Sequence, residues 1–188
     1  MILSDSMLKG VVLRVKTDYE VRGGTTIGDY TACIAGDEGT RWQIRVDGYD
    51  LILLNVGTND IGNRRSASQI CRDYDNLFCR IRHFNSKALI IVASILDRPL
   101  DSVDTADLIK EVNNSLMKKC NDSFHCYFLN SVSVFRYPHT ENLRWEFFSK
   151  GGLHLNAAGK ERLAQYLNSS LSNGYIRTMV DRYPVKKT

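Results

Sequence analysis

One short apolar run constrains the fold of this chain more than any other feature. Leu51–Leu54 is aliphatic throughout, and it is soon followed by Gly57 and by the polar cluster Thr58–Asp60. A continuous apolar run that breaks at a glycine is typical of a central strand in a parallel sheet, buried on both faces. Open α/β sheets bind their ligands just beyond the C-terminal ends of such strands. The polar cluster therefore lies where a functional site is expected.

Three other segments show a similar pattern. The chain is apolar up to Leu3 and polar as far as Ser6, a glycine pair ends at Gly24, and His154 stands just before a helical pattern. Taken singly, each residue has a simpler explanation as a helix cap, a turn residue or a structural histidine. In a parallel sheet, however, all of these segments and Asn59 would follow strand ends, so they can converge on one cleft.

Expected strands alternate with expected helices along the whole chain. The strands are predicted at Met1–Leu3, Val11–Val15, the run around Leu51–Leu54, Lys87–Leu96 and Phe124–Val134. Helices are predicted from Thr25 to Gly36, from Ile70 to Phe84, from a cap at Asp104 or Thr105 to Leu116, and from a cap at Asn156 to Leu171. Repeated β-α units indicate a three-layer α/β/α fold with a central parallel sheet of about five strands.

Composition fits a single globular domain. With 188 residues, of which 43% are hydrophobic, the chain can bury a substantial core. We expect one domain over residues 1–175 and a basic tail over residues 176–188. The net charge of +4 is mildly basic, which is compatible with weak binding of RNA but lacks the concentrated basic run of a nucleic-acid-binding protein. The tail contributes Arg177, Arg182, Lys186 and Lys187.

Cysteine usage and hydropathy bear on location and cofactors. Five cysteines cannot all pair with one another, and none lies in a CxxC motif, so we predict reduced thiols in an intracellular, cytoplasmic protein. No apolar run approaches the roughly 18 residues of a membrane span. The four histidines show no HxxxH or HxH spacing, and we expect neither a metal nor an organic cofactor.

Four short blocks together resemble the SGNH, or GDSL-like, hydrolase family, and the resemblance covers about nine tenths of the chain. The blocks are Ser4-Asp5-Ser6, Gly23-Gly24, Gly57-Thr58-Asn59-Asp60 and Leu153-His154-Leu155-Asn156. The resemblance implies a flavodoxin-like fold and a serine esterase. The segment Ser94–Pro99 and the helix after it look like the SGNH domains of retrotransposon-encoded proteins and their domesticated relatives.

The resemblance also implies a role for each residue. Ser6 would be the nucleophile, and His154 would take its proton and later protonate the leaving alcohol. The oxyanion would be held by the backbone N–H groups of Ser6 and Gly24 and by the side-chain amide of Asn59. The substrate would be a small acyl or acetyl ester.

The sequence departs from the family at one position. The family places an aspartate three residues before the histidine, whereas this chain has Gly151 there. Three outcomes remain open. His154 could work in a Ser-His dyad with a backbone carbonyl as its partner, another acid such as Glu146 could substitute, or the site could be a chemically weak binding pocket.

Two functions from different classes therefore compete. The first is a serine esterase that depends on Ser6. The second is a non-catalytic SGNH-like domain that binds RNA, by analogy with the Oskar-type domain, or that binds a partner protein. Ser6 and His154 favour chemistry, and Gly151 favours binding.

Overall fold

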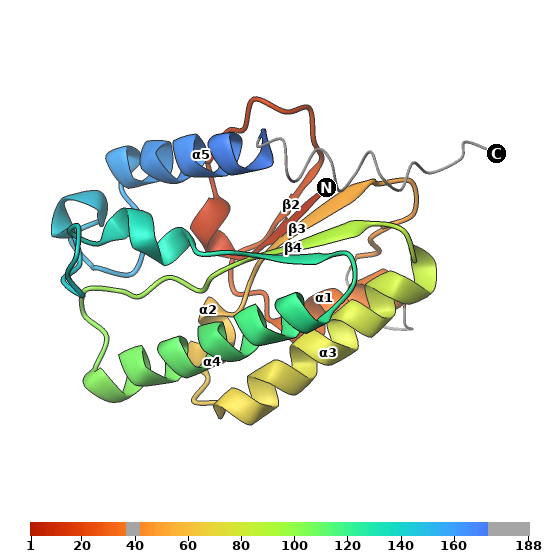
Figure 1. The fold of residues 1–188 in the computed structure, drawn as a ribbon, viewed down its shortest axis with the longest axis horizontal. Helices are drawn as coiled ribbons and strands as arrows, with labels where there is room; N and C mark the ends of the chain where they lie inside the picture. Colours follow the sequence, from red (N-terminus) through yellow and green to blue (C-terminus); the bar gives the residue numbers. More distant parts are fainter. Residues whose placement is uncertain (37–41, 173–188) are drawn as a thin grey trace.

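The computed structural model describes residues 1–36 and 42–172. Within them, five parallel strands form one sheet in the order β2-β1-β3-β4-β5 (Figure 1). The strands are β1 (Ile2–Ser4), β2 (Tyr19–Val21), β3 (Leu51–Asn55), β4 (Leu89–Ala93) and β5 (Cys126–Leu129). This is the flavodoxin-like order, in which the chain changes direction across the sheet between β1 and β3. The predicted fold is confirmed.

Helices cover both faces of the sheet. Figure 1 shows α1 (Ile27–Ala35), α3 (Ala67–Phe84) and α4 (Val103–Asp122) on one side and α5 (Ala157–Leu171) on the other. Side chains of β3 alternate between the two cores, since Ile52 and Leu54 pack with the three-helix face and Leu53 packs with the α5 face. The shorter elements are η1 (Ser6–Leu8), α2 (Thr58–Gly62), η2 (Ser131–Phe135) and η3 (Trp145–Phe147).

Local capping explains where the helices start and stop. Thr26 and Asp29 form a reciprocal capping box at the start of α1, and Gly36 ends the helix at φ 65°, where glycine carries no steric penalty. Asn156 caps α5 as predicted, with its side chain accepting from the Gly159 N–H. Helix α4 starts earlier than predicted, because Ser102 supplies the cap in place of Asp104 or Thr105.

The strand predicted at Val11–Val15 is wrong. The second strand lies at Tyr19–Val21, and the earlier segment packs beside α5, where the Arg14 N–H donates to the Asn168 side chain at 2.8 Å. Val11 and Leu13 are buried there, so the apolar pattern reported burial without specifying a sheet partner.

Two strands are shorter than predicted. β4 covers only the middle of Lys87–Leu96, and in Phe124–Val134 the sheet ends at Leu129, after which the chain turns into η2. No helix among the described residues is long and apolar enough to cross a membrane. The predicted basic tail, from residue 176 onward, lies outside the described residues.

Candidate active site

The strand registers bring three of the four predicted blocks to one edge of the sheet. Ser4, the last residue of β1, pairs with Val21 and with Asn55, the last residues of β2 and β3. The loops that follow these strands therefore leave the sheet side by side. They carry the predicted nucleophile, the glycine pair and the predicted oxyanion amide.

Asp5 fixes the loop that carries Ser6. One of its carboxylate oxygens accepts from the Met7 N–H at 3.0 Å, and the other accepts from the Thr58 N–H at 3.2 Å. The side chain is buried, and burial raises the pKa of Asp5 to about 6 against these hydrogen bonds. The Met7 bond shapes the β1 loop itself, and the Thr58 bond joins that loop to the β3 loop. Ser6 is therefore held half-buried beside the block that contains Asn59.

The glycine pair lies against Ser6, the predicted nucleophile. A Cβ atom added at Gly23 would be 4.0 Å from the Ser6 Cβ, so the β2 loop passes directly beside Ser6. Gly24 adopts φ +79° and has nothing within 4 Å on its side-chain face. This open, left-handed position is one that glycine favours, and it leaves room for a ligand to approach the backbone.

Asn59 joins the glycine loop to the β3 loop. Its Nδ2 atom donates to the Thr25 carbonyl at 2.9 Å, which fixes the plane of the amide. A side-chain amide carries two N–H donors, so one hydrogen remains for a substrate oxygen. The side chain is half-buried, which is compatible with the predicted role as an oxyanion donor.

Asp60 is a buried residue that stabilises the contact between the glycine loop and the β3 loop. It is fully buried, and its carboxylate accepts from the Ile27 N–H at 3.1 Å and pairs with Arg65 at 3.3 Å. Burial raises the pKa of Asp60, while the Ile27 hydrogen bond and the Arg65 charge oppose that shift. The start of α1 is thereby tied to the block that contains Asn59.

Three supporting residues had no predicted role in the sequence. Asp5 and Asp60 belong to the Ser4–Ser6 and Gly57–Asp60 blocks, but the residues that they bind across the site lie far away along the chain. Tyr30 is a fully buried residue of α1, yet its hydroxyl accepts from the Ser4 N–H and lies 2.6 Å from the Ser4 and Glu20 carbonyl oxygens. The sequence offered one signal for Asp5 and Asp60, which is that an acidic residue follows the end of a buried strand.

His154 lies in the loop between η3 and α5. Its carbonyl accepts from the Ser149 N–H at 2.8 Å, and its side chain is exposed. The loop meets the connection after β4, because a Cβ at Gly152 would be 2.9 Å from Leu100 Cγ. Within residues 1–36 and 42–172, no hydrogen bond joins the His154 imidazole to Ser6. The pairing of these two residues stays a prediction.

The two residues relevant to the missing acid are both exposed. A Cβ at Gly151 would meet nothing within 4 Å. The Glu146 carboxylate accepts from Arg144 Nε at 2.7 Å, and this hydrogen bond lowers the pKa of Glu146. In this structure Glu146 is thus paired with Arg144, and its role as a substitute acid stays a prediction.

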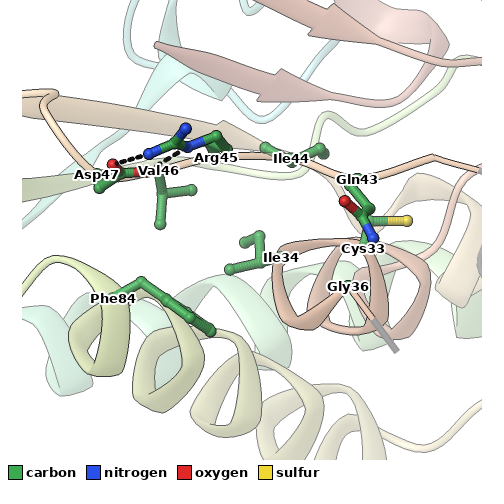
Figure 2. A pocket seen from close by; sticks show the side chains of 9 residues that line it. All are labelled: Cys33, Ile34, Gly36, Gln43, Ile44, Arg45, Val46, Asp47 and Phe84. Carbon is green, nitrogen blue, oxygen red and sulfur yellow. Dashed lines mark hydrogen bonds and ion pairs between the residues drawn. The ribbon is translucent and has the colours of Figure 1, made fainter. Parts of the chain in front are cut away.

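A separate hollow of about 450 Å³ lies away from this edge. Figure 2 shows Ile34, Val46 and Phe84 facing it, with the Arg45–Asp47 ion pair above. Because Phe84 and Asp47 precede the N-terminal ends of β4 and β3, the hollow belongs to the opposite end of the sheet. It is lined by Cys33, Ile34, Gly36, Gln43, Ile44, Arg45, Val46, Asp47 and Phe84.

Solved structures share this fold at low sequence identity. A family 3 carbohydrate esterase from Clostridium thermocellum superimposes with a TM-score of 0.68 at 16% identity, covering 98% of each chain. A carbohydrate esterase family 3 protein from Talaromyces cellulolyticus gives 0.67 at 14% identity, covering 96% of this chain and 97% of that one. The OSK domain of Drosophila Oskar gives 0.70 at 18% identity, covering 92% and 88%.

Sequence comparison identifies the family. No curated protein matches the chain by sequence. The model of the GDSL-like Lipase/Acylhydrolase family matches residues 10–162. That span contains Gly24, Asn59 and His154 and begins just after Ser6. Because the match covers well over half of the sequence, this chain belongs to the GDSL-like lipase/acylhydrolase family.

Proposed function

We propose that the protein is a serine esterase that hydrolyses a small acyl or acetyl ester with a Ser-His dyad. The observation that carries the proposal is the cross-linking of three loops. The Thr58 N–H donates to the Asp5 carboxylate, the Asn59 amide donates to the Thr25 carbonyl, and Gly23 lies beside Ser6. These contacts bring together a hydroxyl, a glycine backbone and an amide. That set matches what acyl transfer needs at the nucleophile and at the oxyanion.

The reaction proceeds in two halves. Ser6 Oγ attacks the ester carbonyl carbon while His154 accepts the hydroxyl proton, and the resulting oxyanion is held by Asn59 and the backbone N–H groups of Ser6 and Gly24. Collapse of this intermediate expels the alcohol, to which His154 returns the proton. Water then attacks the acyl-enzyme with the same base, and the carboxylic acid leaves.

Family membership supports this class of chemistry. The family is one of lipases and acylhydrolases, and two of the structural neighbours are carbohydrate esterases. A sugar acetate is therefore a sensible substrate to test beside a chromogenic ester. With Gly151 in place of an acid, we expect a slow enzyme.

The test is hydrolysis of p-nitrophenyl acetate by the full chain. Ser6→Ala should remove the activity, while Ser169→Ala, an exposed serine on α5, should leave it unchanged. Far-UV circular dichroism and thermal melting of each variant would show that the fold is intact. Equal turnover by the folded Ser6→Ala variant would overturn the proposal.

The RNA-binding alternative is not adopted. The basic residues that motivated it, from Arg177 onward, lie outside the described residues, and the likeness to the OSK domain at 18% identity concerns the fold alone. The retrotransposon relationship and the cytoplasmic location stay predictions from the sequence.

A further inference from the structure

Two cysteines at the end of the molecule opposite the candidate active site lie unusually close together. Cys120 is in the last turn of α4, and Cys126 is the first residue of β5. Their sulfur atoms are hydrogen-bonded at 2.9 Å. A disulfide bond is about 2.05 Å long, so less than about 1 Å of movement separates these thiols from a covalent bond.

The backbone beside Cys126 is fixed in this orientation. Arg82 donates to the His125 carbonyl at 2.7 Å and also to the Ala88 carbonyl, and the Ile90 N–H donates to the same His125 carbonyl at 2.9 Å. His125 itself adopts φ 57°. The turn between α4 and β5 is thus held so that the Cys126 side chain faces Cys120.

The two thiols differ in environment. Cys120 is 2% exposed, whereas Cys126 is half-buried. The hydrogen bond with Cys120 lowers the pKa of Cys126, and the charges of Arg82 and Lys119 act in the same direction against burial. The pKa of Cys120 is raised by the same hydrogen bond and by burial. A partly exposed thiol in a positive environment is the type that reacts first with an oxidant.

We propose that Cys120 and Cys126 form a dithiol site that a disulfide oxidant, such as glutathione disulfide, converts into an intrachain disulfide. The Cys126 thiolate attacks one sulfur of glutathione disulfide and releases a glutathione thiolate. The Cys120 thiol then loses its proton to solvent and attacks the Cys126 sulfur, releasing the second glutathione thiolate. The protein loses two electrons and two protons, and the oxidant gains them as two thiols.

The position of the site sets the consequence of oxidation. Cys126 opens β5 at the N-terminal end of the sheet, whereas Ser6 follows β1 at the C-terminal edge. The bond would close a short ring between α4 and β5. We expect it to raise the melting temperature by about 5 °C and to leave ester hydrolysis unchanged. The inference is therefore independent of the proposed function.

The experiment uses the reduced full chain incubated with increasing glutathione disulfide, then blocked with N-ethylmaleimide and digested with trypsin. No lysine or arginine lies between Cys120 and Arg136, so both cysteines fall in one peptide. Closure makes this peptide lighter by two hydrogen atoms and prevents its alkylation. Cys79, which is exposed, serves as the control thiol because it should take up glutathione as a mixed disulfide.

Closure of the ring at oxidant levels that modify Cys79 only partly would support the proposal. Recovery of the doubly alkylated peptide when Cys79 is fully modified would overturn it. This measurement uses the wild-type sequence, so a folding defect of a variant cannot obscure the result. A Cys120→Ser variant adds a second readout, since Cys126 should then stop at the mixed disulfide with glutathione.

Discussion

Restoring the missing acid is the sharpest test of how His154 is used. We consider Gly151→Asp. A Cβ at residue 151 meets nothing within 4 Å, the glycine is exposed, and its φ lies outside the left-handed range. The aspartate should therefore fit without strain. It would stand three residues before His154, where the family resemblance expects it.

The size of the gain follows from exposure. The aspartate of a serine protease is buried and contributes roughly 10⁴ in turnover. Here residue 151 and His154 are both exposed. An exposed ion pair contributes about 0.2–1 kcal/mol, and the upper value corresponds to roughly fivefold in rate. We expect Gly151→Asp to raise kcat/KM for p-nitrophenyl acetate by about fivefold at pH 8.

The pH profile of kcat/KM shows whether the new carboxylate acts on the His154 imidazole or changes the rate in another way. A carboxylate beside the imidazole favours its protonated form, so the acid limb of the kcat/KM profile should move to higher pH in Gly151→Asp. Gly151→Asn is the matched control, because it adds the same volume without the charge. If the Asp and Asn variants give the same kcat/KM and the same acid limb, a carboxylate at residue 151 does not act on His154.

Two further changes test the rest of the site, and a third tests the packing of α5. Asn59→Ala should lower kcat by about 10²–10³ with little effect on KM, because it removes an oxyanion donor, and steady-state kinetics would check this. Asp5 has a folded pKa of about 6 because of burial, above its ordinary value of about 3.9. The folded protein therefore holds the Asp5 proton more tightly, and stability falls as pH rises from about 4 through 6. In urea unfolding, the free energy of unfolding of Asp5→Asn should rise relative to that of the wild type by up to about 3 kcal/mol between pH 4 and pH 7. A difference that stays constant with pH would contradict this. Gly159→Ala would drive a methyl group into the Phe147 carbonyl oxygen. It should lower the free energy of unfolding by about 1–3 kcal/mol, unlike Gly62→Ala, which meets open space.

Much of the fold could be predicted because its signals are local. Helix α1 shows this well, since Ile27, Tyr30 and Ile34 share one face and Gly36 ends the helix where a left-handed residue is needed. The strand at Val11–Val15 failed for the opposite reason. Apolar residues report that a segment is buried, but whether it meets a sheet edge or a helix depends on segments far away in the sequence.

The same distinction applies to the site. Strand-end positions were enough to expect Ser6, Gly24 and Asn59 near one another. The residues that hold them could not be predicted, because the hydrogen bond from Thr58 to Asp5 and that from Ile27 to Asp60 connect separate loops. The proximity of Cys120 and Cys126 could not be predicted either. One residue lies in the last turn of a helix and the other begins a strand, and this spacing matches no short cysteine motif.

The two halves of the candidate site differ in how they are held. The half with Ser6 and Asn59 depends on buried carboxylates, and losing Asp5 or Asp60 would leave unsatisfied N–H groups in the core. The half with His154 lies on an exposed loop, where residue 151 contacts nothing. A change of side chain at residue 151 therefore costs little stability and leaves the half with Ser6 and Asn59 intact. One substitution at residue 151 should therefore change the rate without changing the fold.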